Sequence, residues 1–595
     1  MFVGCVALAT SCDLTENVQV KTDKSMIFGS KSGLELYSNS FYKALPTLKN
    51  GFMQDKMCDV GAVSNTDTFI KQGAYNTETA TSWSWGALKN INYFIDGCND
   101  PKYCTVDDNT RDNYLGIARW FRAWFYYDKL TTYGEVPWFP HDIQSYQNDV
   151  MYKDRDSRDV IIRNLIADLD FAYEHIQATS STGSSTLTRW AAAALKSRVC
   201  LFEAAYRRYH NLTGLEITPE ELYREAAKAA KLVIDNSGCS LNTATGKKGA
   251  YRDLFYNETP LTQEVILAVC ANEKSGIFGE QNWWFNARSY GLCWSLVRSF
   301  VHTYLKLDGT PFTDAADYAV KSFTEEMEGR DLRLEQTVRG RNFLWDGKTA
   351  VADIKNLSLT GYQVIKYTLD ESKYDGGAKN INSIPLIRYA EVLLNYAEAQ
   401  AELGVITDSE WALTVGALRK RAGITGGTET LPTTVDGYLQ RTFYPDVTSP
   451  VLLEIRRERA IELVAEGMRF DDLRRWKCGS LMETLPWSGI HIPGLEQPVD
   501  VNGDGVDDYY FTEGEVTAAP AAYRNIAIRV NQDGVGLYAE ANAVAGYDLV
   551  YKTGAGDRYW YPDGRQYLYP IPAKVIRDYK NAGYTISQNP YWDNE

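Results

Sequence analysis

The chain has 595 residues, of which 44% are hydrophobic and 23% are charged, a composition typical of a globular protein and not of a disordered one. Its formal net charge of -15 repels phosphate backbones and argues against nucleic acid as a partner. The five histidines show no ligand spacing of the H-E-x-x-H kind, so no histidine-based metal or general-base enzyme is indicated.

The N-terminal residues 1–12 read MFVGCVALATSC. An apolar run that ends in small residues before a cysteine is typical of a bacterial lipoprotein signal, with Cys12 as the acylated residue. No Lys or Arg precedes Lys21, so the basic start of such a signal is missing and we expect it upstream. The run is too short to span a bilayer. Residues 1–12 are therefore predicted to be a signal remnant, and the alternative is an ordinary buried N-terminal segment.

Residues 80–94 read ATSWSWGALKNINYF and place two tryptophans, Trp83 and Trp85, among Ser, Thr and Asn. A helix from about Ser84 would put three apolar residues on one inward face: Leu88, Ile91 and Ile95. Asn92 is expected to tie down a backbone segment. Trp83 and Trp85 fall outside that face, so they are either core or an exposed platform for a flat ring, and we favour the platform.

Cys98 and Cys104 flank the polar loop NDPKY and could close a small disulfide in an oxidising compartment. For the remaining cysteines, scattered buried thiols are an equally good interpretation. None of the cysteines forms a C-x-x-C pair, which argues against a zinc ribbon or a thioredoxin motif.

Helical periodicity dominates the next part of the chain. We expect helices at 111–133, 157–178, 188–210 and 218–236. Thr218 and Pro219 suit the cap and the first position of the last of these. The connections are short and several faces are rich in alanine, as in antiparallel helical hairpins of the tetratricopeptide type. No strict 34-residue consensus repeats.

The periodicity fades between about 240 and 380, where Gly, Asn, Asp and aromatic residues become frequent. This region is predicted to hold long loops with short strands and a few helices. Helices return at 384–404, 408–422 and 449–476, and the stretch from 480 to 595 is again loop and strand. Because the helices are discontinuous in sequence, we expect the loop-rich insertions to gather on one side as a binding surface.

The returning helices carry many charges. Glu391, Glu398 and Glu402 lie near one another on a single helix, and paired carboxylates can indicate a glycosidase; ordinary solvated or Arg-paired groups are the favoured interpretation. In 454–475 the charges alternate in sign at helical spacing. That pattern suits intrahelical ion pairs more than a basic binding patch.

Residues 500–509 read DVNGDGVDDY and resemble a calcium loop. The predicted ligands are the side chains of Asp500, Asn502, Asp504 and Asp508 and the carbonyl of Val506. Gly505 falls at the sharp turn of such a loop. Phe511 replaces the bidentate Glu of an EF-hand, so a structural calcium site in a loop is expected instead. The alternative is an Asp/Gly turn that binds no metal.

Several segments resemble the SusD/RagB family. They are IPLIRYAEVLLNYAEAQAELG and LLEIRRERAIELVAEGMRFDDLRRW, the ending YLYPIPAKVIRDYKNAGYTISQNPYW, and near the N-terminus NINYF and RWFRAWFYYDKLTTYGEVP. These matches spread from residue 83 to 592. We therefore divide the chain into the signal remnant, a SusD-like helical region at 13–240 and a SusD/RagB region with loop insertions at 241–595.

The resemblance implies a mainly α fold, a tetratricopeptide-type helical scaffold with a loop-rich, partly β ligand-binding face. It also implies a lipid-anchored protein on the outer surface of Bacteroidetes-type bacteria. Such a protein is not an enzyme; it binds glycans, or peptides in some members, and serves a TonB-dependent outer-membrane barrel of the SusC kind. The alternatives left open are a peptide-binding relative and a glycoside hydrolase.

A glycan site needs aromatic rings for the apolar face of a sugar and polar partners for its hydroxyls. The resemblance implies contributions from two regions. The first region offers Asp67, Trp83, Trp85 and Asn90. The second region offers Trp283, Trp284, Asn286, Arg288, Tyr290 and Trp294. We expect Trp85 to be the residue whose removal weakens binding most clearly.

Overall fold

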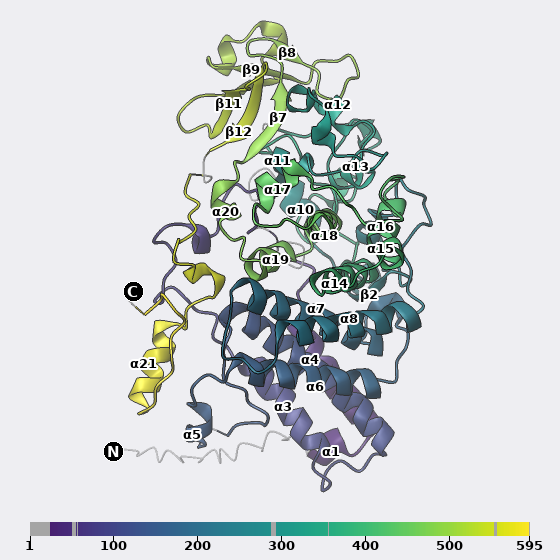
Figure 1. Cartoon of the computed structure of the whole chain (residues 1–595), viewed down its shortest axis with the longest axis vertical. Coiled ribbons are helices and arrows are strands. Elements are labelled where there is room, and N and C mark those ends of the chain that lie inside the picture. The colour runs from purple at the N-terminus through teal and green to yellow at the C-terminus, as the bar shows by residue number, and fades with distance from the viewer. Residues whose placement is uncertain are drawn as a thin grey trace, which may run out of the picture.

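The structure is a computed structural model that describes residues 24–593 except 50–54, 56, 145, 287–292, 355 and 553–555. The predicted signal remnant and Cys12 lie outside the described residues. The helical first half of the chain forms one end of the molecule, and strands from the last quarter form the opposite end (Figure 1). None of the helices in the described part is long and apolar enough to cross a membrane.

The helices differ greatly in length, and the long ones belong to the predicted helical segments. Their bounds are α1 Lys24–Phe28, α2 Lys31–Ser38, α3 Gly86–Cys98, α4 Asp108–Tyr133, α5 Asn148–Met151, α6 Arg158–His175, α7 Arg189–Tyr209, α8 Pro219–Asn236, α9 Asp253–Tyr256, α10 Gln281–Asn286, α11 Arg298–Val301, α12 Phe323–Met327, α13 Arg333–Thr337, α14 Tyr389–Glu402, α15 Asp408–Leu413, α16 Val415–Arg421, α17 Gly437–Phe443, α18 Pro450–Glu462, α19 Arg469–Arg475, α20 Leu481–Thr484 and α21 Ala573–Asn581.

The strands are short and form small separate sheets. Their bounds are β1 Gly61–Ala62, β2 Val265–Val269, β3 Ser295–Leu296, β4 Leu344–Trp345, β5 Lys348–Thr349, β6 Ile384–Arg388, β7 Ser488–Ile492, β8 Pro498–Val499, β9 Tyr509–Thr512, β10 Ala527–Arg529, β11 Leu537–Ala541 and β12 Tyr547–Tyr551. The two three-stranded sheets have the orders β10-β9-β8 and β11-β12-β7. Only the β10–β9 pair is parallel among the named pairs of the described chain.

The long helices pack in sequence order, α3 against α4, α4 against α6, α6 against α7, α7 against α8, α8 against α14 and α14 against α18. The alanines at 191–194 are all buried, so the backbone of α7 approaches its neighbours closely. Thr218 and Glu221 form the capping box of α8, with Pro219 in its first turn, as the sequence predicted. The mainly α, tetratricopeptide-type scaffold is confirmed.

Three predicted helix boundaries were wrong. The segment expected to be helical from residue 384 opens with the buried strand β6, which pairs antiparallel with β2; periodicity cannot distinguish a short apolar strand from a buried helix. The 408–422 helix is divided at Thr414, whose ψ is -92°. The 449–476 helix is interrupted between α18 and α19, where Ala465 and Gly467 have positive φ.

A distant side chain stabilises the second of these interruptions. The buried carboxylate of Asp55 accepts hydrogen bonds from the backbone N–H of Gly467 at 3.0 Å and of Arg469 at 3.2 Å. It thereby satisfies N–H groups at the start of α19. The break consequently depends on a contact between residues about four hundred positions apart, which local sequence patterns do not encode.

The charges of α18 do not pair mainly along their own helix. Glu462, fully buried, contacts Arg388 at 3.0 Å and Arg333 at 2.9 Å and also binds Arg421. Burial alone would raise the pKa of Glu462, but the three guanidinium groups hold it well below its ordinary value. Arg457–Glu454, at 3.1 Å, is one pair that does form within α18. The prediction of mainly intrahelical pairing was therefore wrong.

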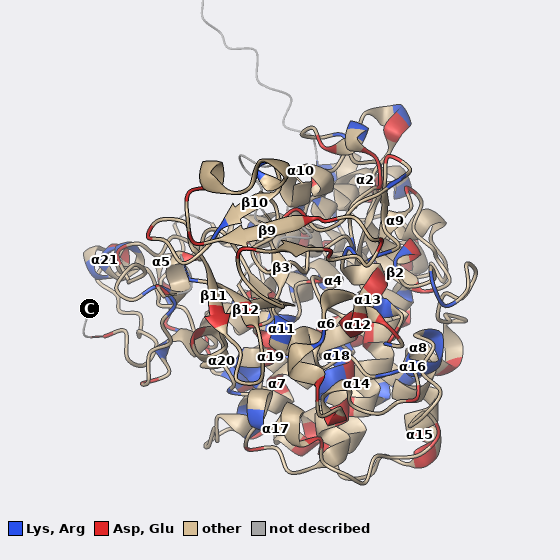
Figure 2. Cartoon of the chain, turned by 90° about the horizontal axis from the view of Figure 1, so that it is seen from above, with Lys and Arg blue, Asp and Glu red and all other residues tan. Residues whose placement is uncertain are grey.

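The three glutamates of α14 are paired with arginines of other helices. Arg198 binds Glu391, Arg475 binds Glu398, and Arg208 binds Glu402. The Arg-paired interpretation of these groups is confirmed. Basic and acidic positions lie next to each other around α8, α12 and α16 (Figure 2).

Cys98 and Cys104 are free thiols in the structure, so the disulfide considered for them does not form there. Cys98 is buried at the end of α3, and burial raises the pKa of its thiol.

Replacing Glu462 with Gln should destabilise the protein strongly, because it leaves three buried guanidinium groups without their shared counter-charge. A loss of about 3–5 kcal/mol of unfolding free energy is expected, measured by urea denaturation. The matched control is Glu429→Gln, which removes a carboxylate that is 66% exposed and lies 2.6 Å from Lys420; its effect should stay below about 1 kcal/mol. Equal effects of the two substitutions would contradict this account of the core.

Candidate ligand-binding site

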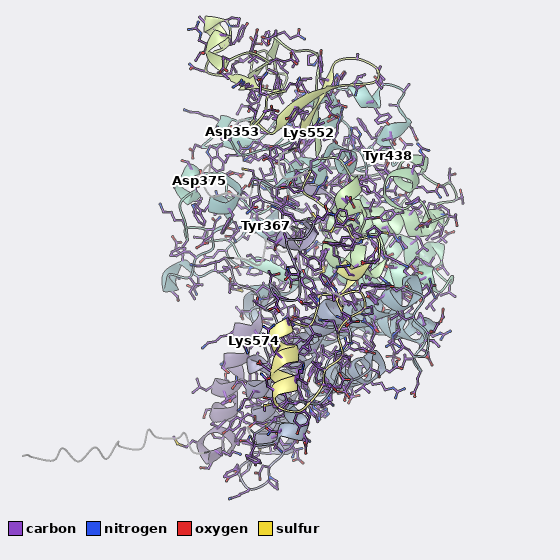
Figure 3. The ribbon with its side chains drawn as sticks, turned by 90° about the vertical axis from the view of Figure 1, so that its left-hand side faces the viewer. Asp353, Tyr367, Asp375, Tyr438, Lys552 and Lys574 are labelled. Atoms are coloured by element: carbon purple, nitrogen blue, oxygen red, sulfur yellow. The ribbon has the colours of Figure 1, made fainter. Side chains whose placement is uncertain are left out.

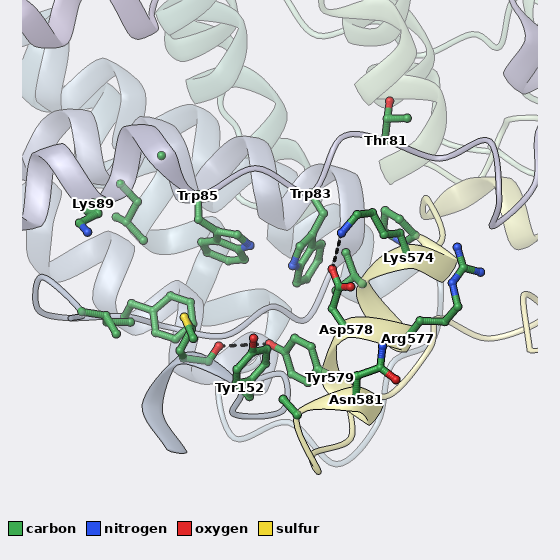
Figure 4. A pocket seen from close by; sticks show the side chains of 18 of the residues that line it. Thr81, Trp83, Trp85, Lys89, Tyr152, Lys574, Arg577, Asp578, Tyr579 and Asn581 are labelled. Atoms are coloured by element: carbon green, nitrogen blue, oxygen red, sulfur yellow. Dashed lines mark hydrogen bonds and ion pairs between the residues drawn. The ribbon is translucent and has the colours of Figure 1, made fainter. Parts of the chain in front are cut away.

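A large hollow, called here the first hollow, lies between the segment before α3, helix α5 and helix α21 (Figure 4). Its volume is about 1300 Å³, enough for a ligand of several rings. Trp83 and Trp85 both line it, together with Tyr152 and Tyr579 from the facing side. Residues from the start and the end of the chain thus form one site.

The tryptophan wall is held by the core behind it. The rings of Trp83 and Trp85 are 5.3 Å apart and nearly perpendicular. Trp85 also contacts Phe125 at 5.6 Å and Phe139 at 5.2 Å between ring centroids. Both tryptophans are half-buried. Each therefore packs one part of its ring on the core and presents another part to the hollow.

Two polar contacts fix this wall to helix α4 and its neighbourhood. The Lys129 ammonium donates to the carbonyl oxygen of Ser82 at 3.2 Å, directly before Trp83. Asn92, which is buried, donates to the carbonyl oxygens of Phe139 at 2.8 Å and of His141 at 3.1 Å. Asn92 ties down a backbone segment as expected, and the aromatic wall is consequently pre-formed.

The opposite wall is the amphipathic helix α21. Tyr579 packs against Tyr152 with ring centroids 5.1 Å apart and donates to the carbonyl oxygen of Lys153 at 3.2 Å. Burial raises the pKa of Tyr579 to about 12, so its hydroxyl remains a donor at neutral pH.

The rim of α21 is charged. Lys574 pairs with Asp578, and Arg577 reaches Glu78, each at 2.6 Å (Figure 4). Exposed pairs of this kind contribute little to stability. Their charged groups remain available to a polar ligand.

The other predicted residues of the first region do not join this hollow. Asn90 accepts a hydrogen bond from the Tyr37 hydroxyl at 2.6 Å and lines a separate groove beside α2. Asp67 caps the short 3₁₀ turn Thr68–Ile70 by accepting from the backbone N–H of Phe69 at 3.0 Å. The structure thus brings together only the two tryptophans of that group.

The second predicted region lies elsewhere. Trp283 and Trp284 belong to α10 and contact each other at 4.9 Å, and Trp284 donates to Glu280 at 3.3 Å. Asn286, on the same helix, donates to Asp375 at 3.2 Å. Figure 3 shows Asp375 at a different level of the molecule from Lys574 of the first hollow. The two regions are therefore separate.

Of the three further candidates in that second region, the structure describes one. Trp294 is 3% exposed, so its ring belongs to the core. Arg288 and Tyr290 lie outside the described residues.

A family model described as the SusD family matches residues 263–592, more than half of the chain. The chain belongs to the SusD family. A curated relative, SusD-like protein P38 of Formosa agariphila, is 25% identical over 380 residues. That match covers 61% of this chain and 66% of the relative, so the chain spans just under two thirds of the relative's length.

Solved structures of SusD-like proteins share the fold. A SusD-like carbohydrate binding protein from Bacteroides fragilis has a TM-score of 0.67 at 18% identity, covering 94% of this chain and 99% of that one. A second SusD-like protein from Bacteroides fragilis has a TM-score of 0.63 at 20% identity, covering 96% and 98%. A SusD homologue from Bacteroides thetaiotaomicron has a TM-score of 0.63 at 16% identity, covering 96% and 99%. At these identities the likeness establishes the fold alone.

In this SusD family member the predicted calcium loop connects β8 to β9. Asp500 accepts hydrogen bonds from the backbone N–H groups of Gly503 and Gly505 at 2.7 and 2.8 Å. Both glycines have positive φ, as the tight turn requires. Burial, with the nearby charges of Asp500 and Asp504, raises the pKa of Asp508.

The loop side chains are engaged within the loop itself. In the described part of the chain no group of three or more His, Cys, Asp or Glu side chains is gathered as a metal site. The donors are nevertheless all oxygens, the kind that calcium prefers. Calcium binding here stays a prediction.

Sequence reasoning missed the residues that α21 contributes. The C-terminal segment that carries the family resemblance contains Tyr579, Lys574 and Arg577. That segment indicated membership of the family, but it did not indicate where these three side chains lie in the fold. The alternating apolar and charged residues of α21, of which only Tyr579 is buried, were the available signal. They indicate a helix that covers a surface instead of filling a core.

Proposed function

We propose that this SusD family member binds oligosaccharides in the first hollow and delivers them to a SusC-like TonB-dependent outer-membrane transporter. The main observation behind this proposal is that Trp83 and Trp85 are half-buried in an open hollow. Tyr152 and Tyr579 face them across it. Sugar rings have an apolar face that packs on aromatic rings, and their hydroxyls need nearby donors and acceptors. The charged rim of α21 and Lys89 supply those polar groups.

Two further facts support a carbohydrate ligand and a binding role. One solved protein of this fold is described as carbohydrate binding. The carboxylates that sequence reasoning considered for glycosidase chemistry, Glu391, Glu398 and Glu402, are paired with arginines inside the scaffold. They are therefore committed to packing and not placed around a substrate cleft.

Replacing Trp83 or Trp85 with Ala should weaken oligosaccharide binding by about 1–3 kcal/mol, the scale of stacking on an aromatic side chain. Tyr579→Ala should also weaken it, because it removes the residue that fixes α21. Binding is measured by calorimetry against a panel of defined oligosaccharides and, in parallel, against a panel of peptides. Each oligosaccharide mixture is then analysed for hydrolysis products.

The matched control is Trp190→Ala, which removes a half-buried indole outside the first hollow. Thermal unfolding of each variant separates weakened binding from impaired folding. Unchanged affinity in all three hollow variants would show that the site is elsewhere. Binding to the peptide panel alone would show that the ligand is a peptide and not a glycan. Release of shorter products from the oligosaccharides would show that the protein is an enzyme.

The proposal includes a lipid anchor on Cys12 and attachment to the outer membrane. Mass spectrometry of the protein from native membranes should find the acyl groups on Cys12. A TonB-dependent barrel should co-purify with it. A barrel that is recovered equally well from membranes lacking this chain would contradict the partnership.

We also propose that calcium binds the 500–508 loop, through Asp500, Asn502, Asp504, Asp508 and the carbonyl of Val506. A cation there would offset the repulsion among neighbouring carboxylates and rigidify the connection between β8 and β9. Calcium at about a hundred times its dissociation constant should add about 3 kcal/mol of stability, measured by calorimetry with and without a chelator.

Asp504→Ala should abolish that calcium-dependent stabilisation. Asp533→Ala, an exposed acidic residue in another loop, should leave it intact. A wild-type protein whose unfolding temperature is the same in calcium and in chelator would rule the site out.

A further inference from the structure

A second hollow lies on one face of helix α4, next to the first. Its volume is about 660 Å³. Trp124, Tyr127 and Asp128 of α4 line it, and Ala87 of α3 and Asp471 of α19 close its sides. None of these residues was predicted from the sequence as a ligand contact.

The two hollows meet at the start of α3. Gly86 lines the first hollow and the next residue, Ala87, lines the second. The ring of Phe125, which lines the second hollow, lies 5.6 Å from the ring of Trp85, which lines the first. Trp85 provides no side-chain cap for α3, so N–H groups of its first turn lie where the hollows join.

Polar atoms in the second hollow are available to a ligand. Within the described part of the chain, neither the Tyr127 hydroxyl nor the Trp124 indole N–H has a hydrogen-bond partner. The Asp128 side chain is 67% exposed and has Lys129 as its ionic neighbour at 3.7 Å. Aromatic rings, free donors and a carboxylate acceptor are the combination that a hydroxyl-bearing ring requires.

The charged residues of this hollow are paired. Arg198 also lines it, and Glu391 neutralises Arg198 through two contacts of 2.6 Å. Asp128 has Lys129 as its neighbour and Asp471 is bound by Arg474. A neutral ring needs no further counter-charge here and can donate its hydroxyls to the two carboxylates.

We infer that the second hollow is a further subsite for the same glycan chain, which bends around the start of α3 and places neutral sugar rings against Trp124, Tyr127 and Asp128. The inference rests on the proposed function. It adds that the ligand is an oligosaccharide longer than the first hollow holds, and that its affinity rises with chain length across two adjoining sites.

The experiment compares a disaccharide with an octasaccharide of the same neutral sugar, using glucose, xylose and mannose series, by calorimetry. The test variant combines Tyr127→Phe and Asp128→Asn, which remove one hydroxyl and one charge without creating a cavity. It should weaken octasaccharide binding by about 3- to 10-fold for each hydrogen bond to the sugar that is removed. It should leave disaccharide binding unchanged.

Two controls make the result specific. Trp83→Ala should weaken both ligands, because it alters the first hollow. Tyr538→Phe removes a hydroxyl in β11, outside both hollows, and should change neither. Equal affinity of the wild type for the two lengths, or an unchanged octasaccharide affinity in the double variant, would overturn the second subsite while leaving the first hollow as the binding site.

Other results separate the two proposals further. If the double variant weakens both lengths equally, the second hollow is not a separate subsite and the inference fails. If no series binds the wild type at all, the glycan proposal fails and the second subsite fails with it.

Discussion

The structure depends on the burial of Glu462 among three arginines. Its carboxylate joins Arg333 of α13, Arg388 at the end of β6 and Arg421 of α16 to helix α18. Glu264 adds contacts of 2.9 Å to Arg388 and 3.1 Å to Arg421. Each charge taken from water costs several kcal/mol unless its partners are well placed. The arrangement therefore holds only when all these elements are in position together.

That constraint fixes where the binding surface can form. Contacts hold the helices from α3 to α18 and the loop-rich middle of the chain together. The face of α4 and the start of α3 therefore belong to a rigid scaffold. Trp83 and Trp85 are positioned by this base through Lys129, Phe125 and Phe139. The facing wall, α21, is attached through Tyr579, the exposed Arg577–Glu78 ion pair and a backbone hydrogen bond of 2.9 Å from Ala573 to Thr77. Its apolar residues Val575 and Ile576 also pack against the core.

The sequence predicted what depends on neighbouring residues. The cap at Thr218, the long helices and the family were all recognised from local patterns. Prediction from the sequence failed where a distant residue decides the outcome. Asp55 stabilises the break before α19. Glu462 pairs with Arg388, Arg421 and Arg333 and not with residues of its own helix. The candidate site followed the same division. The sequence named Trp83 and Trp85 as candidates, and both line the first hollow. Tyr579 and Tyr127 could be placed only once the fold had brought their helices beside α3.

The pair of tryptophans in ATSWSWGALKNINYF combines contacts with the core and exposure to the first hollow. A tryptophan that stood free in water would lose much of its binding energy to the cost of ordering its side chain. Here contacts with Phe125 and Phe139 have already ordered Trp85 before any ligand arrives. The part of the ring left in the hollow can then bind a flat partner at little entropic cost. Under the proposed function, burial of one part of the ring would therefore strengthen binding by the other part.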